Sequence, residues 1–160
     1  MSEKEIRISY KQYDSASDLD DRIQDLIRNC IAFANKAYAP YSKFRVSALA
    51  YLENGSEVAG TNVENASYPV SICAERNVLS TAISNYPDIP ISELYIYADV
   101  NSEIAVPPCG LCRQSLVEAE QRQNKKIRLF LISKNGQITV LDSASDLLPL
   151  HFDGSFLKQG

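Results

Sequence analysis

The sequence predicts an α/β domain in which helices pack on a single sheet. Its 160 residues suit one domain, and no linker, repeat or low-complexity tract divides them. The composition, 45% hydrophobic and 22% charged, is typical of a chain that folds around a core. In the middle of the chain, stretches with the apolar spacing of a helix alternate with short strand-like stretches, which favours helices packed on a sheet.

The start of the chain leaves two interpretations open. Ile6, Ile8 and Tyr10 alternate with polar residues, as in a short edge strand. The same stretch is also consistent with a mobile arm. We expect residues 1–20 to form an N-terminal extension ahead of a single domain at residues 21–156.

The first helix is expected to begin near Ser17 and Asp20, whose three-residue spacing resembles a capping box. Apolar residues then recur every three or four positions, and the helix should end before Pro40. Cys30 lies on this apolar stripe, so we interpret it as a small buried hydrophobic residue.

The remaining elements alternate between strands and helices. Asn54-Gly55 and Asn135-Gly136 each mark the tight turn of a hairpin. The expected elements are strands at 44–52 and 57–63, a polar loop at 62–68, a helix at 73–84, a strand at 91–98, a helix at 109–123, and strands at 127–132 and 137–141.

Charge and hydropathy exclude several classes of function. Sixteen basic against twenty acidic residues give a net charge of −4, which argues against a nucleic-acid partner. No apolar stretch approaches the length of a membrane span, and the first residues lack the apolar centre of a signal peptide. We therefore expect a cytoplasmic protein without a membrane partner.

Three cysteines form a candidate zinc site. Cys109 and Cys112 are three residues apart at the start of a predicted helix, so their sulfurs share one face. Cys73 begins another predicted helix, and helices that follow neighbouring strands can start at the same sheet edge. Thiolates suit Zn²⁺, and a helix N-terminus stabilises them. By themselves, Cys109 and Cys112 also fit a thiol redox pair.

The number of ligands separates a catalytic zinc site from a structural one. A structural site has four protein ligands, whereas a catalytic site has three and leaves a position for water. A fourth protein ligand would have to be Cys30 or His151, and if neither binds, the fourth ligand is water, which favours catalysis. Glu75 could then act as a general base and general acid beside the metal. Arg76, on the same helical face as Cys73, is expected to donate hydrogen bonds to the thiolates and offset their charge.

Four stretches together resemble the small, homotetrameric, zinc-dependent cytidine deaminases. They are AYAPYSKFRV (37–46), GTNVENASYPVSICAER (60–76), PCGLCRQ (108–114) and LLPLHF (147–152). The resemblance implies a three-layer fold with a five-stranded mixed sheet flanked by helices. Ser47 is a departure, because the family usually has glycine there.

The resemblance also implies a role for individual residues. Cys73, Cys109 and Cys112 would bind one Zn²⁺ per subunit, and Glu75 would be the proton shuttle. The implied substrate contacts are Asn62 and Glu64 to the ribose hydroxyl, Phe44 against the pyrimidine, the backbone amide of Ala74 to the base, and Tyr68 and Phe152 lining a site shared between subunits.

The expected function is therefore that of a hydrolase acting on the C–N bond of a cyclic amidine. It would deaminate cytidine and 2′-deoxycytidine to the uridine nucleosides, with release of ammonia, in pyrimidine salvage. Three alternatives remain: a deaminase of another cytosine-bearing nucleoside, a non-catalytic structural zinc module, and a thiol redox protein.

Overall fold

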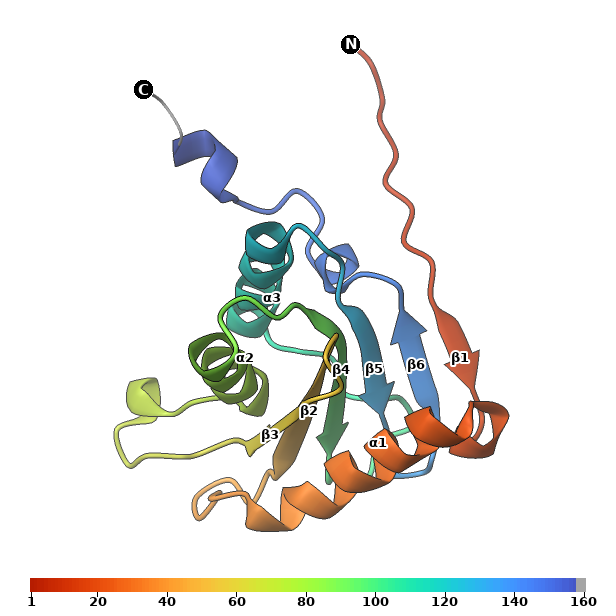
Figure 1. The fold of residues 1–160 in the computed structure, drawn as a ribbon, viewed down its shortest axis with the longest axis vertical. Coiled ribbons are helices and arrows are strands. Elements are labelled where there is room, and N and C mark those ends of the chain that lie inside the picture. The colour runs from red at the N-terminus through yellow and green to blue at the C-terminus, as the bar shows by residue number, and fades with distance from the viewer. Residues whose placement is uncertain (158–160) are drawn as a thin grey trace.

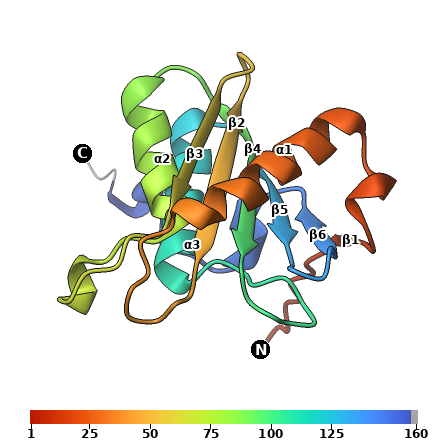
Figure 2. The same cartoon turned by 90° about the horizontal axis from the view of Figure 1, so that it is seen from below.

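A mixed sheet with helices on both faces forms the protein, in a computed structural model that describes residues 1–157. The spatial order of the strands is β1-β6-β5-β4-β2-β3. The strands are β1 (Lys11–Tyr13), β2 (Val46–Leu52), β3 (Glu57–Thr61), β4 (Ile91–Ala98), β5 (Arg128–Ile132) and β6 (Ile138–Leu141), and the helices are α1 (Asp21–Phe33), α2 (Ala74–Asn85) and α3 (Gly110–Gln123). Helix α1 covers one face, and α2 and α3 cover the other (Figures 1 and 2).

The sheet has six strands, so the expectation of five was wrong. The additional strand is β1, which pairs antiparallel with β6 at the sheet edge. It consists of Lys11, Gln12 and Tyr13 and does not include the alternating residues before it. Strand β6 is only four residues long, which limits the length of chain that can pair with it.

Helix α1 begins later than Ser17. Its N-cap is Asp20, whose side chain accepts a hydrogen bond of 3.0 Å from the backbone N–H of Ile23. The helix ends at Phe33 and is followed by one 3₁₀ turn, before Pro40 as expected. Cys30 is completely buried against the sheet, which confirms its interpretation as a core residue.

Alternate residues of the central strands fill two separate cores. In β4, Leu94 and Ile96 pack under α2 and α3, whereas Tyr95 and Tyr97 pack under α1. The Tyr95 ring stacks on that of Phe130, with centroids 4.5 Å apart and planes 9° from parallel. Both faces of the central strands are therefore buried, which fixes their register.

A partly buried ion pair joins α1 to the sheet. Arg22 donates hydrogen bonds of 2.8 and 3.0 Å to the Glu93 carboxylate, and the Tyr95 hydroxyl donates another of 2.7 Å. Burial opposes ionisation of Glu93, but the hydrogen bonds from Arg22 and Tyr95 lower its pKa. The Glu93 side chain is 10% exposed, so it depends on these partners.

Ser47, which departs from the resembled family pattern, is buried beneath α1. Its hydroxyl donates a hydrogen bond of 2.6 Å to the carbonyl oxygen of Cys30. The extra polar group is therefore satisfied within the core.

The topology brings the starts of α2 and α3 to one sheet edge. Strand β3 runs parallel to β4, because each pairs antiparallel with β2. Chain leaving β3 leads to α2, and chain leaving β4 leads to α3, so both helices begin beyond the same edge. Gly60 lets α2 lie close to β3: a Cβ atom there would be 2.9 Å from Cγ2 of Val78. Among the described residues, no helix has the length and apolar character to span a membrane.

Candidate active site

Two helix N-termini supply the three cysteines. Cys73 is the N-cap residue of α2, and Cys109 is the N-cap residue of α3. Cys112 lies in the first turn of α3 and is completely buried. Neither N-cap side chain accepts a capping hydrogen bond from a backbone N–H of its helix, unlike the serine or aspartate usual at this position. The sulfurs lie instead at the positive ends of two helix dipoles, where thiolates are stabilised.

The spacing of the sulfurs fits one zinc ion. Sγ of Cys109 is 3.9 Å from Sγ of Cys73 and 3.4 Å from Sγ of Cys112. All three sulfurs lie within 4.8 Å of one another. Zn–S bonds of about 2.3 Å in a tetrahedral arrangement separate two sulfurs by about 3.8 Å. The donor atoms therefore need to move only slightly to bind one Zn²⁺, and the donor set suits that metal.

Two of the thiols, those of Cys73 and Cys112, differ in how readily they lose a proton. The hydrogen bond with Cys112 lowers the pKa of Cys73 to about 6. The same hydrogen bond raises the pKa of Cys112. Cys73 is therefore the thiol most easily deprotonated of this pair, as a metal ligand must be.

Neither candidate for a fourth ligand belongs to the cluster. Cys30 lies on the opposite face of the sheet, and burial raises the pKa of its thiol to about 12. Nδ1 of His151 lies 2.8 Å from the carbonyl oxygen of Leu148. Across residues 1–157, the three cysteines are the sole group of His, Cys, Asp or Glu side chains close enough to hold a metal. Within the described residues, the cluster therefore lacks the fourth protein ligand that a structural zinc site requires.

A cavity of about 620 Å³ opens beside the cysteines, a volume that suits a small-molecule ligand. Cys73 and Cys109 form part of its wall. Glu75 also lines it and is only 5% exposed, and this burial raises the pKa of its carboxyl group. The other predicted residues on the wall are Phe44, Asn62, Glu64, Tyr68 and Ala74. The cavity thus combines a metal site, a buried carboxyl group and an aromatic side chain.

Asn62 holds the backbone that carries Phe44. Its Oδ1 accepts a hydrogen bond of 2.8 Å from the N–H of Val46, and its Nδ2 donates one of 2.8 Å to the carbonyl oxygen of Phe44. One amide N–H and one lone pair of the Asn62 side chain remain for a ligand. These bonds hold the backbone of Phe44, a cavity residue that is 39% exposed.

Glu64 performs a similar task for the neighbouring loop. Its carboxylate accepts hydrogen bonds from the backbone N–H of Tyr41, at 2.9 Å, and of Ser42, at 3.3 Å. The Ser42 hydroxyl also donates to it and is the largest cause that lowers the Glu64 pKa. Glu64 is consequently an ionised acceptor, with capacity left for a hydroxyl of a ligand.

The sequence reasoning did not single out Tyr41 and Ser42, although both lie within the quoted stretch at residues 37–46. Tyr41 meets Tyr68 edge to face at the cavity, with ring centroids 6.0 Å apart. Tyr68 is 70% exposed, so most of its ring is accessible. Two further wall residues, Val106 and Pro107, come from the loop before α3, whose conformation has no periodic signal in the sequence.

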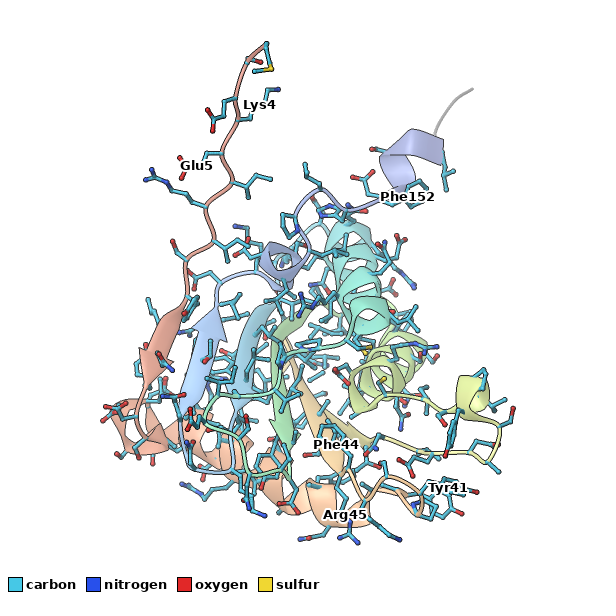
Figure 3. All side chains as sticks on the ribbon, turned by 180° about the vertical axis from the view of Figure 1, so that it is seen from behind. Lys4, Glu5, Tyr41, Phe44, Arg45 and Phe152 are labelled. Carbon is cyan, nitrogen blue, oxygen red and sulfur yellow. The ribbon has the colours of Figure 1, made fainter. Side chains whose placement is uncertain are left out.

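Phe152 lies apart from this cavity within its own chain (Figure 3). It lines a different hollow, over α2 and α3, together with Arg76. Nε2 of Gln114 donates a hydrogen bond of 2.9 Å to the Phe152 carbonyl oxygen. The structure therefore brings all the other predicted substrate contacts together, but not Phe152.

Two arginines flank the cysteines in different ways. No hydrogen bond within residues 1–157 joins Arg76 to a cysteine sulfur, although its positive charge helps to lower the pKa of Cys73 after the larger effects of neighbouring groups. Arg113 donates to the carbonyl oxygens of Pro108, at 2.8 Å, and Leu147, at 3.0 Å. Arg113 thus fixes the residue that precedes Cys109 and ties it to the C-terminal segment.

Comparison with known proteins identifies relatives of one kind. The family described as "Cytidine and deoxycytidylate deaminase zinc-binding region" matches residues 20–126. A cytidine deaminase of Halalkalibacterium halodurans is 37% identical over 126 residues, which cover 79% of this chain and 90% of the relative. One of Sporosarcina psychrophila is 34% identical over 137 residues, covering 86% and 93% respectively. The crystal structure of cytidine deaminase from Burkholderia pseudomallei has a TM-score of 0.72 at 34% identity, covering 84% of this chain and 100% of that chain.

Proposed function

The chain belongs to the cytidine and deoxycytidylate deaminase family, and we propose that it deaminates cytidine and 2′-deoxycytidine by zinc-dependent hydrolysis. One observation supports this most strongly. The cavity, whose volume suits a nucleoside, is lined by the buried Glu75 and by Cys73 and Cys109, two of the three cysteines whose sulfurs fit one zinc ion. The products would be ammonia and the corresponding uridine nucleoside, as in pyrimidine salvage.

The metal site and Glu75 would divide the chemistry between them. Zinc held by Cys73, Cys109 and Cys112 would supply a Lewis acid that activates water for attack at C4 of the base. Glu75 accepts one proton from the attacking water and donates it to N3 of the ring, which makes C4 electrophilic. Glu75 next carries the proton of the new C4 hydroxyl group to the amino group. The C4–N bond then breaks, and ammonia leaves with the bonding electrons.

The cavity wall would recognise a free nucleoside. The Phe44 ring would pack against the pyrimidine, and the backbone N–H of Ala74 would donate to the base. Asn62 and Glu64 would bind a ribose hydroxyl with the amide N–H and the carboxylate oxygen that their backbone contacts leave available. A polynucleotide is disfavoured, because the net charge is −4.

A second subunit would complete the site. Tyr68 stands exposed at the cavity, whereas Phe152 lies over α2 and α3 of its own chain. In a homotetramer, Phe152 would reach the cavity of a neighbouring subunit. We place the catalytic domain at residues 21–156, after an extension at 1–20, and the enzyme in the cytoplasm. Four free cysteines suit a reducing compartment.

The direct test is the ultraviolet absorbance of cytidine incubated with the zinc-loaded protein. Loss of the cytidine band with release of ammonia supports the proposal, whereas no conversion by a sample with verified zinc refutes it. Glu75→Gln should retain zinc and lose nearly all turnover. Glu103→Gln, on an exposed loop, is the matched control and should turn over cytidine normally.

A further inference from the structure

The residues before β1 form an extended arm that leaves the body of the protein. Residues 1–10 belong to no helix or strand of the described chain and run away from the sheet edge (Figure 1). Lys4 and Glu5 point into solvent on this arm (Figure 3). The arm continues directly into β1, whose outer edge has no neighbouring strand in the described sheet.

The arm has the side-chain pattern of a strand that lacks its partner. Ile6, Ile8 and Tyr10 share one face and are 55%, 44% and 62% exposed. The opposite face carries Glu5 and Arg7, which form an ion pair with each other. An unpaired strand edge with exposed apolar side chains is a place where another strand can add.

We propose that this arm pairs antiparallel with the arm of a second copy of the chain, about a two-fold axis at Ile8. In this register Ile8 faces Ile8 of the second copy, and Ile6 faces Tyr10. On the opposite face, Glu5 faces Lys11 of the second copy, an opposite-charge pair that stabilises an antiparallel ladder. The contact between Ile6 and Tyr10 and the contact between Glu5 and Lys11 each occur twice, as two-fold symmetry requires, and the Ile8 pair lies on the axis.

Charge selects this register over its neighbours. Residues that oppose each other across the ladder must lie on the same face, so an alternative register shifts one strand by two residues against the other. Such a shift moves the two-fold axis by one residue. Moving the two-fold axis to Arg7 places two arginines directly opposite each other. Moving it to Ser9 places Arg7 opposite Lys11. Both alternatives oppose like charges, whereas the axis at Ile8 opposes none.

The length of the arm keeps the two protein bodies apart. With the axis at Ile8, β1 of the second copy lies opposite residues 3–5 of the first. The two β1 strands are then offset by eight residues, or about 26 Å along the ladder. The bodies also lie on opposite sides of the paired arms, since each arm uses its free edge. The paired arms join both sheets into one.

Cysteine cross-linking of the zinc-loaded full chain tests this register. Two directly opposed residues have Cα atoms about 5 Å apart, which a disulfide can bridge. Ile8→Cys should therefore form a covalent dimer on mild oxidation with oxidised glutathione. Ile6→Cys is the matched control, because two such residues would lie about 13 Å apart. Several-fold more dimer from Ile8→Cys on a non-reducing gel supports the proposal. Equal cross-linking of the two variants, or none with Ile8→Cys, overturns it.

A charge exchange provides an independent test by sedimentation velocity. Glu5→Lys and Lys11→Glu should each weaken the arm-dependent association, and the double variant should restore it. Glu5→Lys also breaks the ion pair between Glu5 and Arg7 within one chain. An association weakened for that reason alone would not be restored by adding Lys11→Glu. A double variant as weakly associated as the single variants contradicts the proposed contact. Deamination should be unchanged, since the arm lies outside the cavity.

Discussion

Ser42 donates its hydroxyl hydrogen and its backbone N–H to the carboxylate of Glu64, the residue proposed to bind the sugar. Tyr41 adds a second backbone N–H to the same carboxylate. Glu64 is thereby fixed in both ionisation state and direction before any ligand arrives. The loop at residues 41–42 thus acts as a positioning device for the carboxylate.

Ser42→Ala should raise KM for cytidine about tenfold, with a smaller change in kcat, because it removes one hydrogen bond to the charged Glu64. Steady-state kinetics check this split. The variant should also lose discrimination between cytidine and an analogue lacking the sugar hydroxyl. Ser56→Ala, in the turn between β2 and β3, is the control. Unchanged KM in Ser42→Ala would show that Glu64 needs no such support.

Cys109→Ser should abolish zinc binding at stoichiometric metal, and turnover with it, because it removes one of three ligands. Elemental analysis after gel filtration measures the zinc content. Cys30→Ala should keep one zinc per chain, since its sulfur lies across the sheet. Loss of zinc from Cys30→Ala alone, with a normal circular dichroism spectrum, would contradict the assignment of ligands.

Arg76→Gln tests whether positive charge near the sulfurs supports the metal. We expect zinc affinity or kcat to fall about tenfold. Replacing a residue that contacts metal ligands from outside the ligand shell typically lowers metal affinity or activity about 10- to 100-fold. Chelator competition and kinetics provide the two readouts. The expected effect is at the low end because Arg76 acts on Cys73 by charge, without a hydrogen bond to sulfur among the described residues. If neither quantity changes, Arg76 has no role in the metal site.

Arg22→Met should destabilise the fold by about 2 kcal/mol at neutral pH, because it leaves the buried Glu93 carboxylate without its cation. This is less than for a fully buried pair, since the Arg22 side chain is 45% exposed. Urea unfolding measures the change. Arg28→Met, which breaks an exposed pair with Asp25, is the control and should cost far less.

The same pair makes stability depend on pH. The Glu93 pKa in the folded protein is lower than in the unfolded chain, where it is about 4.3. Its contribution is therefore present above about pH 4.3 and is lost as the pH falls through the lower, folded value. In Arg22→Met this acid-dependent loss should be absent or reversed. An identical pH profile in both proteins would exclude Glu93 as its source.

Local signals predicted most of the architecture. The two Asn-Gly turns were confirmed, and Gly55 and Gly136 adopt φ values of +84° and +95°, which glycine favours. Cys30 was confirmed as a core residue because helical periodicity reports directly on burial. Strand β1 had no comparable signal, since its three residues form an edge with little apolar character. The position of β1 depends on which residues of β6 have backbone groups free to pair on their outer side.

The site was predictable as a set of residues but not as a network. Spacing placed Cys109 beside Cys112, and the strand–helix order placed Cys73 near them. The hydrogen bonds of Asn62 and Glu64 to residues 41–46 depend on how two loops meet, which no periodicity encodes. The sequence pattern also did not predict how far Phe152 lies from the cavity of its own chain. That distance depends on the path of the C-terminal segment over α3.

The metal would act as a cross-link in the chain as well as a reagent. Cys73 and Cys109 are 36 residues apart in sequence, and the segment between them contains α2 and β4. Closing a loop of this length removes conformational entropy from the unfolded chain, worth about 4 kcal/mol if the metal holds as a disulfide does. A nascent chain that ends before residue 109 has no place to bind the ion. Metal loading would therefore require that the starts of α2 and α3 have come together, and a chelator would weaken the link between the two helices as well as stop turnover.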